Sequence, residues 1–171
     1  MTIRVGLACA GDLSAVVSLD QLVWGEGAWT RADYLAHLRQ GSFQLRVARD
    51  ELVPPGEFPL GASILSHQLP GPTLVLDRFL VHPHHRQTGL ATSLLRHHLL
   101  LAHQRKFRSV RIHVPDRSDW LPMHRFLARH GFHGVIDRNH YQEGNSICFS
   151  LLVPHPKTPG EYPETISRPE E

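Results

Sequence analysis

The chain of 171 residues contains only two cysteines, Cys9 and Cys148, and carries a formal net charge of +2 at pH 7. Both cysteines lie in apolar, strand-like runs, so a reduced protein explains them more simply than a disulfide scaffold. The small net charge gives no argument for a nucleic-acid partner. No apolar run approaches the ~20 residues that cross a bilayer, and the first residues lack the apolar run of a signal peptide. We therefore expect a cytoplasmic protein with no nucleic-acid or membrane partner.

Two common nucleotide-binding motifs are also absent. The P-loop pattern GxxxxGK[ST] does not occur, because Leu90 and Ala91 follow Gly89 and the next lysine is Lys106. The dinucleotide pattern GxGxxG is missing as well. Any phosphate group that this chain binds must therefore be held by another arrangement.

The most informative segment runs from Leu76 to Thr92. It reads as an apolar strand, a turn of prolines and histidines, and then a helix that opens with Arg-Gln-Thr-Gly-Leu-Ala-Thr at residues 86–92. Gly89 and Ala91 let a ligand approach the backbone closely. The first turn of a helix leaves N–H groups without intrahelical partners, at the positive end of the macrodipole. The segment is therefore suited to binding a diphosphate.

The same segment resembles a known family. Residues 86–91 match the R/Q-x-x-G-x-G/A pattern of the GNAT superfamily of coenzyme A-dependent N-acetyltransferases, V-x-P-x-x precedes it at 81–85, and His-Gly-Phe follows at 130–132. The resemblance covers about residues 3–153 and is strongest over 76–132. It implies an enzyme that moves acetyl from acetyl-CoA to a primary amine by direct attack through a tetrahedral intermediate. The nearest relatives are expected among the N-terminal and ribosomal-protein acetyltransferases, with either a peptide N-terminus or a small-molecule amine as acceptor.

The apolar periodicity agrees with this family. It predicts helices from a Gly11-Asp12 cap to about Val23, at Arg31–Arg39, at Gly89–Phe107 and from a Ser118 or Asp119 cap to Gly131. It predicts strands at Ile3–Ala8, Phe43–Arg49, Leu60–His67, Thr73–Val81, Ser109–Val114, Val135–Asp137 and Ser146–Val153, with a loop at Leu52–Pro59. We expect an α/β protein, with a twisted mixed sheet of about seven strands and helices on both faces. Residues 1–153 would form the acetyltransferase domain, and the proline-rich residues 154–171 a flexible tail.

The resemblance also assigns the cofactor-binding residues. The diphosphate of coenzyme A would lie on the backbone N–H groups of Arg86, Gln87, Thr88, Gly89, Leu90, Ala91 and Thr92. The pantetheine arm would bind in strand fashion to the main chain of Phe79, Leu80 and Val81, and a backbone N–H near Leu80 would stabilise the oxyanion.

Two residues are candidates for the general base. His113 is a polar residue in the apolar strand Val-Arg-Ile-His-Val-Pro, and an imidazole can take a proton near neutral pH. Relatives among the N-terminal acetyltransferases carry a His or Glu at the matching place. A histidine on the solvated strand face or hydrogen-bonded in the core is the alternative interpretation. Asp77, on the strand that leads into the diphosphate segment, is the competing base, although it could instead pair with an arginine.

The general acid is where the sequence departs from the family. Many members have a tyrosine four residues before the glycine of the Gly-Phe pair, and here that residue is Leu127. Tyr141, in Arg-Asn-His-Tyr, resembles a tyrosine that relatives place beside the acceptor, and is our third candidate catalytic residue. An ordinary strand-edge tyrosine is the alternative. The missing acid also motivates a second function, an acyl-CoA-binding sensor or scaffold with weak or no catalysis.

The histidines at 82, 84 and 85 raise the possibility of a metal site, but a zinc site needs three or four converging ligands. We interpret them as the turn beside the diphosphate site and expect no metal. The family is compatible with a monomer or a homodimer.

Overall fold

A computed structural model describes residues 3–50, 61–141 and 144–154, with the side chains of 50, 139–141 and 144 excepted. Seven strands lie within these ranges: β1 (Ile3–Leu7), β2 (Phe43–Asp50), β3 (Ala62–Gln68), β4 (Thr73–Val81), β5 (Ser109–Pro115), β6 (His133–Tyr141) and β7 (Gly144–Leu152). The α-helices in the same ranges are α1 (Leu13–Trp24), α2 (Arg31–Leu38), α3 (Leu90–Gln104) and α4 (Leu121–Arg129). Short 3-10 turns lie at Ala10–Asp12, Gly25–Gly27, Pro83–His85 and Ser118–Trp120.

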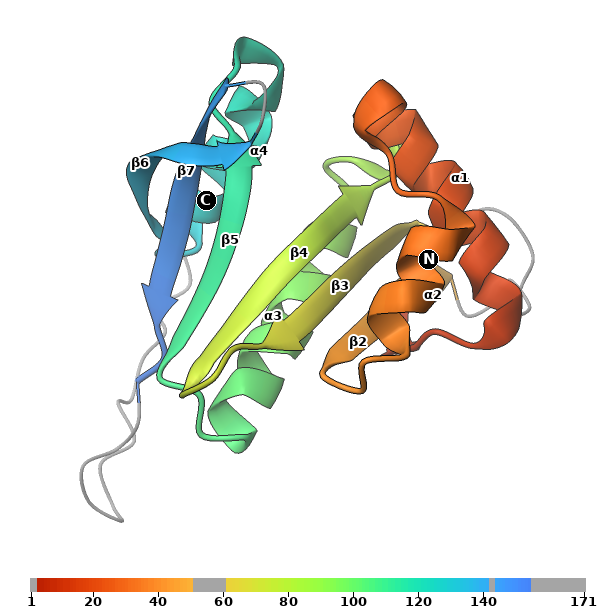
Figure 1. Cartoon of the computed structure of the whole chain (residues 1–171), viewed down its shortest axis with the longest axis horizontal. Helices are drawn as coiled ribbons and strands as arrows, with labels where there is room; N and C mark the ends of the chain where they lie inside the picture. The colour runs from red at the N-terminus through yellow and green to blue at the C-terminus, as the bar shows by residue number, and fades with distance from the viewer. Residues whose placement is uncertain (1–2, 51–60, 142–143, 155–171) are drawn as a thin grey trace.

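The strands form one mixed sheet in the order β1-β2-β3-β4-β5-β7-β6. Neighbouring strands are antiparallel except β4 and β5, which run parallel. Figure 1 shows α1 and α2 in front of the β1–β4 part of the sheet and α3 behind it. This arrangement confirms the predicted fold class.

Several predicted boundaries hold because local signals fix them. The strand at Thr73–Val81 is found with the predicted bounds. The Thr30 side chain accepts a hydrogen bond from the Asp33 N–H at 3.3 Å, while the Asp33 carboxylate accepts from the Thr30 N–H at 2.8 Å. This capping box starts α2 at the residue that the sequence predicted.

Other boundaries differ from the prediction. The helix α3 ends at Gln104 rather than Phe107, because Lys106 adopts a left-handed φ of 60° and the Phe107 N–H returns to the Ala102 carbonyl at 2.9 Å. Such a reversal ends a helix while burying the next apolar side chain. The 3-10 turn at Ser118–Trp120 precedes α4, so the helix begins at Leu121 and not directly after a Ser118 or Asp119 cap.

The closing pair of strands is longer than predicted. β6 extends through polar residues to Tyr141, because the pairing of β6 with β7 resumes at Tyr141 and Gly144 beyond a shift in register. The predicted loop at Leu52–Pro59 and all of the predicted tail except Pro154 lie outside the described residues.

Two apolar clusters lie on opposite faces of the sheet. The larger one joins α3 and α4 to side chains that include Leu76 and Phe79 of β4. The smaller one joins α1 and α2 to side chains that include Leu80 of the same strand. The strand β4 therefore contributes to both cores.

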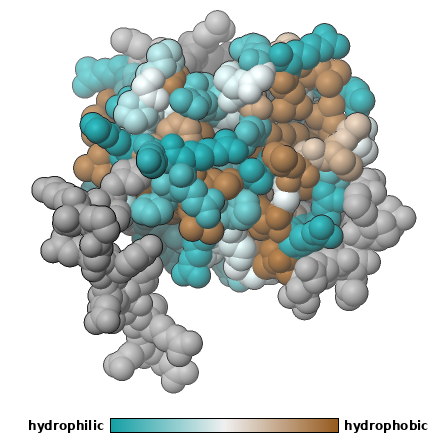
Figure 2. Space-filling view, turned by 90° about the horizontal axis from the view of Figure 1, so that it is seen from below, coloured by the Kyte–Doolittle hydropathy of each residue, from teal (hydrophilic) through white to brown (hydrophobic). Residues whose placement is uncertain are grey.

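Some apolar side chains also reach the surface. Figure 2 shows a hydrophobic area beside hydrophilic residues on one face of the molecule. No helix within residues 3–50, 61–141 and 144–154 is long and apolar enough to span a bilayer.

Candidate active site

The parallel strands β4 and β5 pair over only part of their length. Their register joins residues 73–76 of β4 to residues 109–112 of β5 and ends at Leu76 and Ile112. Beyond that point β4 pairs only with β3, and β5 pairs only with β7. The two strands diverge, as Figure 1 shows. Asp77 and His113 are the first residues after the last β4–β5 pair.

A β-bulge shapes β4 at this same point. In its pairing with β3, Leu76 lies opposite Ser66 and Arg78 lies opposite Leu65, so Asp77 is the extra residue. A bulge bends its strand and redirects the side chains beside it. Here it places both Asp77 and Arg78 on the wall of a pocket.

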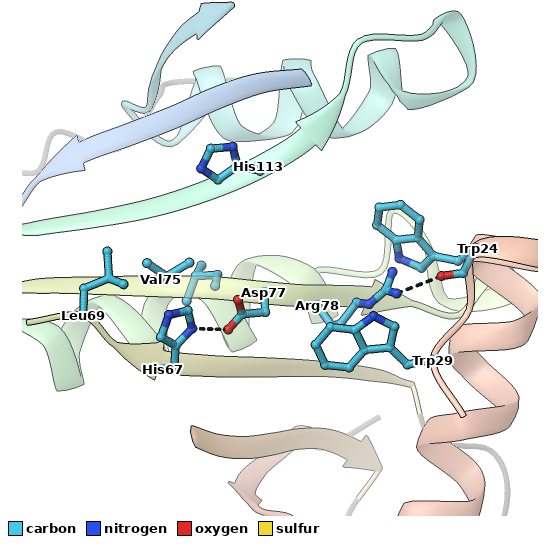
Figure 3. Close-up of a pocket in the computed structure, with 10 residues that line it drawn as sticks. Trp24, Trp29, His67, Leu69, Val75, Asp77, Arg78 and His113 are labelled. Atoms are coloured by element: carbon cyan, nitrogen blue, oxygen red, sulfur yellow. Dashed lines mark hydrogen bonds and ion pairs between the residues drawn. The ribbon is translucent and has the colours of Figure 1, made fainter. Parts of the chain in front are cut away.

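That pocket has a volume of about 540 Å³, in the range of small-molecule sites. It lies on the face of the sheet that carries α1 and α2, and Figure 3 shows the residues around it. Its lining comes from the end of α1 and the segment that joins α1 to α2, from β3 and β4 with the turn between them, and from β5. The lining residues are Trp24, Gly27, Trp29, His67, Leu69, Val75, Leu76, Asp77, Arg78 and His113.

His113 faces this pocket. Its neighbours Ile112 and Val114 enter the core with α3 and α4, and side chains alternate along a strand, so His113 points to the opposite face. Its side chain is 19% exposed, and its Nδ1 lies 3.7 Å from an Asp137 carboxylate oxygen on β6. The carboxylate is close enough to stabilise a protonated imidazole electrostatically.

Asp77 enters the pocket from the opposite side, on β4. Its Oδ2 lies 2.5 Å from His67 Nδ1, so the carboxylate pairs with a histidine and not with an arginine. Burial raises the pKa of the Asp77 carboxyl, and the hydrogen bond from His67 partly opposes that increase. Both candidate bases thus reach one cavity, across the point where β4 and β5 part (Figure 3).

Arg78 forms a rigid wall at one end of the pocket. Its guanidinium carbon lies 4.4 Å from the centroid of the Trp24 ring and 4.7 Å from that of Trp29. One guanidinium N–H donates to the Gly27 carbonyl at 2.8 Å, and Nε lies 3.7 Å from Asp20 Oδ2. The Tyr34 hydroxyl donates to that same Asp20 oxygen at 2.7 Å. These contacts fix the segment between α1 and α2 against β4.

The segment between β4 and α3 presents a row of backbone amides. Gln87 and Gly89 have positive φ angles of 63° and 85°, a backbone pattern that points successive N–H groups toward one site. Among the described residues, none accepts a hydrogen bond from the amides of residues 87–92. Arg86 is exposed beside them. This donor set fits an anionic group such as a diphosphate.

The remaining cofactor candidates lie on β4. Phe79, Leu80 and Val81 pair with β3 on one side, and their other strand edge borders the opening toward β5. The side chains of Phe79 and Leu80 are buried on opposite faces of the sheet. The main chain, rather than these side chains, is therefore placed to contact a ligand in the opening.

The candidates for a general acid give a different result. Leu127 is fully buried in the core beneath α4, so this position supplies no proton. Tyr141 ends β6, where its backbone pairs with Gly144, and its side chain lies outside the described part of the structure.

The histidines after β4 lie close to one another. The rings of His84 and His85 lie 5.4 and 5.6 Å from that of His82, measured between centroids. In the part of the chain that the structure describes, no group of three or more His, Cys, Asp or Glu residues could hold a metal ion. Cys9 and Cys148 are both free thiols.

Sequence reasoning missed five residues of this site. His67 and Arg78 join it only because the bulge in β4 sets their register. Trp24 and Trp29 flank the segment Gly-Glu-Gly-Ala at 25–28, which matches no motif. Asp137 ended a predicted strand, and only the β5-β7-β6 order brings it near His113. No local motif signals such contacts.

Comparison with known proteins identifies the family. A family model described as the acetyltransferase (GNAT) family matches residues 18–132, which is more than half of the chain. No curated protein matches the chain in sequence. The chain belongs to the GNAT acetyltransferase family, whose acetyl donor is acetyl-CoA.

Solved structures of this family share the fold. Ard1 from Thermoplasma volcanium is 20% identical, with a TM-score of 0.75 over 91% of this chain and 100% of that one. The ribosomal-protein-S18-alanine N-acetyltransferase from Escherichia coli is 16% identical, with a TM-score of 0.70 over 94% and 99%. The NatC complex bound to Gag peptide and CoA is 13% identical, with a TM-score of 0.74 over 90% and 100%. At these identities the likeness shows the fold.

Proposed function

We propose that this protein is an acetyl-CoA-dependent N-acetyltransferase that acts on a primary amine, either a peptide N-terminus or a small molecule. One observation carries the proposal: His113 and Asp77 converge on one pocket where β4 and β5 part. The two free cysteines favour a reducing compartment such as the cytoplasm.

The donor side of the site is built from main chain. The amides of residues 87–92 would hold the diphosphate, with the N-terminus of α3 behind them. The main chain of residues 79–81 would hold the pantetheine arm, which directs the thioester into the opening between the strands. Acetyl-CoA supplies the activated acetyl group and a thiolate leaving group.

The acceptor side uses the two facing acid–base groups. Asp77 attracts the ammonium of the acceptor, and neutral His113 takes one proton from it. The Asp137 carboxylate then stabilises the imidazolium, since it lies 3.7 Å from Nδ1. The neutral amine attacks the thioester carbonyl, and the backbone N–H near Leu80 stabilises the oxyanion. Collapse of the tetrahedral intermediate breaks the carbon–sulfur bond and expels the thiolate, and the second proton of the attacking nitrogen passes to this thiolate or to water.

The departing sulfur needs little help from the protein. A thiol has an ordinary pKa of ~8.5, so a thiolate can leave without a general acid. The buried Leu127 is compatible with this step. Tyr141 stays our candidate for a group that protonates the sulfur or contacts the acceptor.

Leu127 also favours a second candidate function. Since no hydroxyl group occupies that position of α4, the protein could bind acyl-CoA as a sensor or scaffold without efficient transfer. Tight binding of acetyl-CoA together with no turnover on any amine would favour this alternative.

The test is release of free thiol from acetyl-CoA over a panel of amines and peptides. We expect His113→Gln to lower kcat/KM roughly 100-fold or more, because it removes the base. Asp77→Asn should raise KM for the acceptor more than it lowers kcat, since it removes the attraction for the ammonium. His133→Gln, which changes an exposed histidine of β6, serves as the matched control and should retain full activity.

Calorimetric titration with coenzyme A separates catalysis from binding. All three variants should bind coenzyme A as the wild type does, because none of these side chains contacts the amides of residues 87–92. If turnover survives His113→Gln but is lost in Asp77→Asn, then Asp77 is the base. If folded wild-type protein binds no coenzyme A, the proposed function is wrong.

A further inference from the structure

The acceptor pocket has a reactive centre between two different ends. Figure 3 shows Asp77 and His113 across its middle, with Trp24, Arg78 and Trp29 toward one end and His67, Leu69 and Val75 toward the other. The identity of the acceptor therefore depends on what each end can bind.

The aromatic end offers no unbalanced charge. Arg78 is only 6% exposed, and its guanidinium is covered by two indole rings. Asp20, which is fully buried, balances its charge from 3.7 Å. A buried cation that is already compensated gives little attraction for a carboxylate on the acceptor. This end does not select an amino acid or another anionic amine.

The reactive centre provides one negative charge for one positive charge. Asp77 is the single carboxylate among the described residues that line the pocket. Its pairing with His67 fixes its orientation at the middle of the cavity. The reacting ammonium forms an ion pair with this carboxylate. A second cationic group of a diamine would therefore have no partner in the described lining.

The other end is apolar and held in place. Leu69 and Val75 are half-buried and line the pocket. The Leu69 N–H donates to the Thr73 carbonyl at 3.1 Å, which fixes the turn between β3 and β4. The His67 ring stacks on Phe43 with 4.6 Å between centroids, so the wall beside Leu69 is also rigid. An apolar group placed here would leave water without losing a hydrogen bond.

From these three parts we infer that the acceptor is a monoamine with an apolar body, whose ammonium lies between Asp77 and His113 and whose body lies over Val75 and Leu69. This inference rests on the proposed function and narrows its acceptor class. The same chemistry occurs in a free alkyl- or arylalkylamine and in a peptide that begins with an apolar residue. The experiment therefore includes both sources.

The first experiment compares acceptors on the wild-type protein. In the series from propylamine to hexylamine, each added methylene should lower KM about fourfold until the apolar end is filled, because about 0.8 kcal/mol accompanies each buried methylene. 1,4-Diaminobutane and glycine should be poor acceptors. A tetrapeptide amide that begins with leucine, set against one that begins with glycine, tests the peptide source.

The second experiment changes the apolar end itself. Leu69→Glu should remove most of the dependence on chain length, and the milder Val75→Thr, which keeps the shape of the side chain, should weaken it. Leu100→Glu changes an exposed leucine of α3, outside the pocket lining, and should leave the dependence intact. Quenching of tryptophan fluorescence measures amine binding directly, since Trp24 and Trp29 line the pocket.

The outcomes separate this inference from the proposed function. If no amine is acetylated but hexylamine still binds more tightly than diaminobutane, and Leu69→Glu removes that preference, the inference holds and the proposed function fails. If amines are acetylated with no dependence on apolar length, or if a diamine or an amino acid is preferred, the inference is wrong and the function stands. An unchanged preference in Leu69→Glu would also overturn it.

Discussion

At the scale of single residues, His98 is an ionisable group inside the core. It is 1% exposed on α3, and its ring contacts the Leu94 carbonyl through Nδ1 at 3.0 Å. Burial lowers the pKa of His98 to about 4, the Leu94 carbonyl opposes this decrease, and the nearby Arg46 and His97 add to it. His98 lies on the buried face of this helix, together with Leu94, Leu95 and Ala102.

The stability of the protein should therefore depend on this residue in acid. The unfolded imidazole takes up a proton near pH 6.5 and the folded one only near pH 4, so the free energy of unfolding decreases as the pH falls between these values. His98 accounts for roughly 3 kcal/mol of this decrease between pH 7 and pH 4. In urea titrations, His98→Leu should lose less stability than the wild type over this range by about that amount. His133→Gln is the exposed control, and equal slopes for the wild type and His98→Leu would contradict the assignment.

At the scale of elements, the segment between β4 and α3 depends on Gly89. Its φ of 85° is strained for any other residue, although a Cβ there would meet no atom within 4 Å. Gly89→Ala should cost about 1–2 kcal/mol of stability, and should also weaken coenzyme A binding about tenfold by turning the amides away.

A matched glycine separates these two effects. Gly41 has a φ of 70° and equally open surroundings, but lies in the turn between α2 and β2. Gly41→Ala should show the same loss of stability in urea titrations with unchanged coenzyme A binding by calorimetry. A similar loss of binding in both variants would show that the strain acts through the whole fold.

Most elements were predictable because their signals are local. The strand at Thr73–Val81 is an apolar run after a Pro-Gly-Pro turn, and Thr30 with Asp33 marks the start of α2. The bulge at Asp77 was not predictable, because it exists only in the pairing of β4 with β3. The same reason hid the partner of each candidate base: His67 and Asp137 meet Asp77 and His113 through the order of strands, not through spacing along the chain.

At the scale of the whole molecule, the sheet consists of two arms joined by the short β4–β5 pairing. Trp24 at the end of α1 contacts Trp120, which precedes α4, with 4.5 Å between ring centroids. The helix α1 covers the β1–β4 arm, and Trp120 follows β5 in the other arm. This contact therefore connects the two arms across the opening between β4 and β5.

Loss of this contact should loosen the arms relative to each other. Trp120→Ala should lower the free energy of unfolding by about 2–3 kcal/mol, because it removes both the ring contact and the packing against the larger core, and Trp120→Phe should retain most of that stability. Trp120→Ala should also raise KM for the acceptor, because its contact partner Trp24 lines the pocket. The neighbouring Leu121→Ala, which shortens a side chain that is 45% exposed, should change neither quantity. Identical KM values in Trp120→Ala and the wild type would show that the contact does not shape the site.

The position of β4 between the two cores has a consequence for how this enzyme can evolve. The candidate acid–base residue Asp77 lies between side chains that hold both cores together, so a mutation that alters the proposed chemistry also endangers folding. Leu69 lies on a surface turn, where substitutions cost little stability. Descendants of this chain could thus exchange one acceptor for another while the transfer step stayed the same.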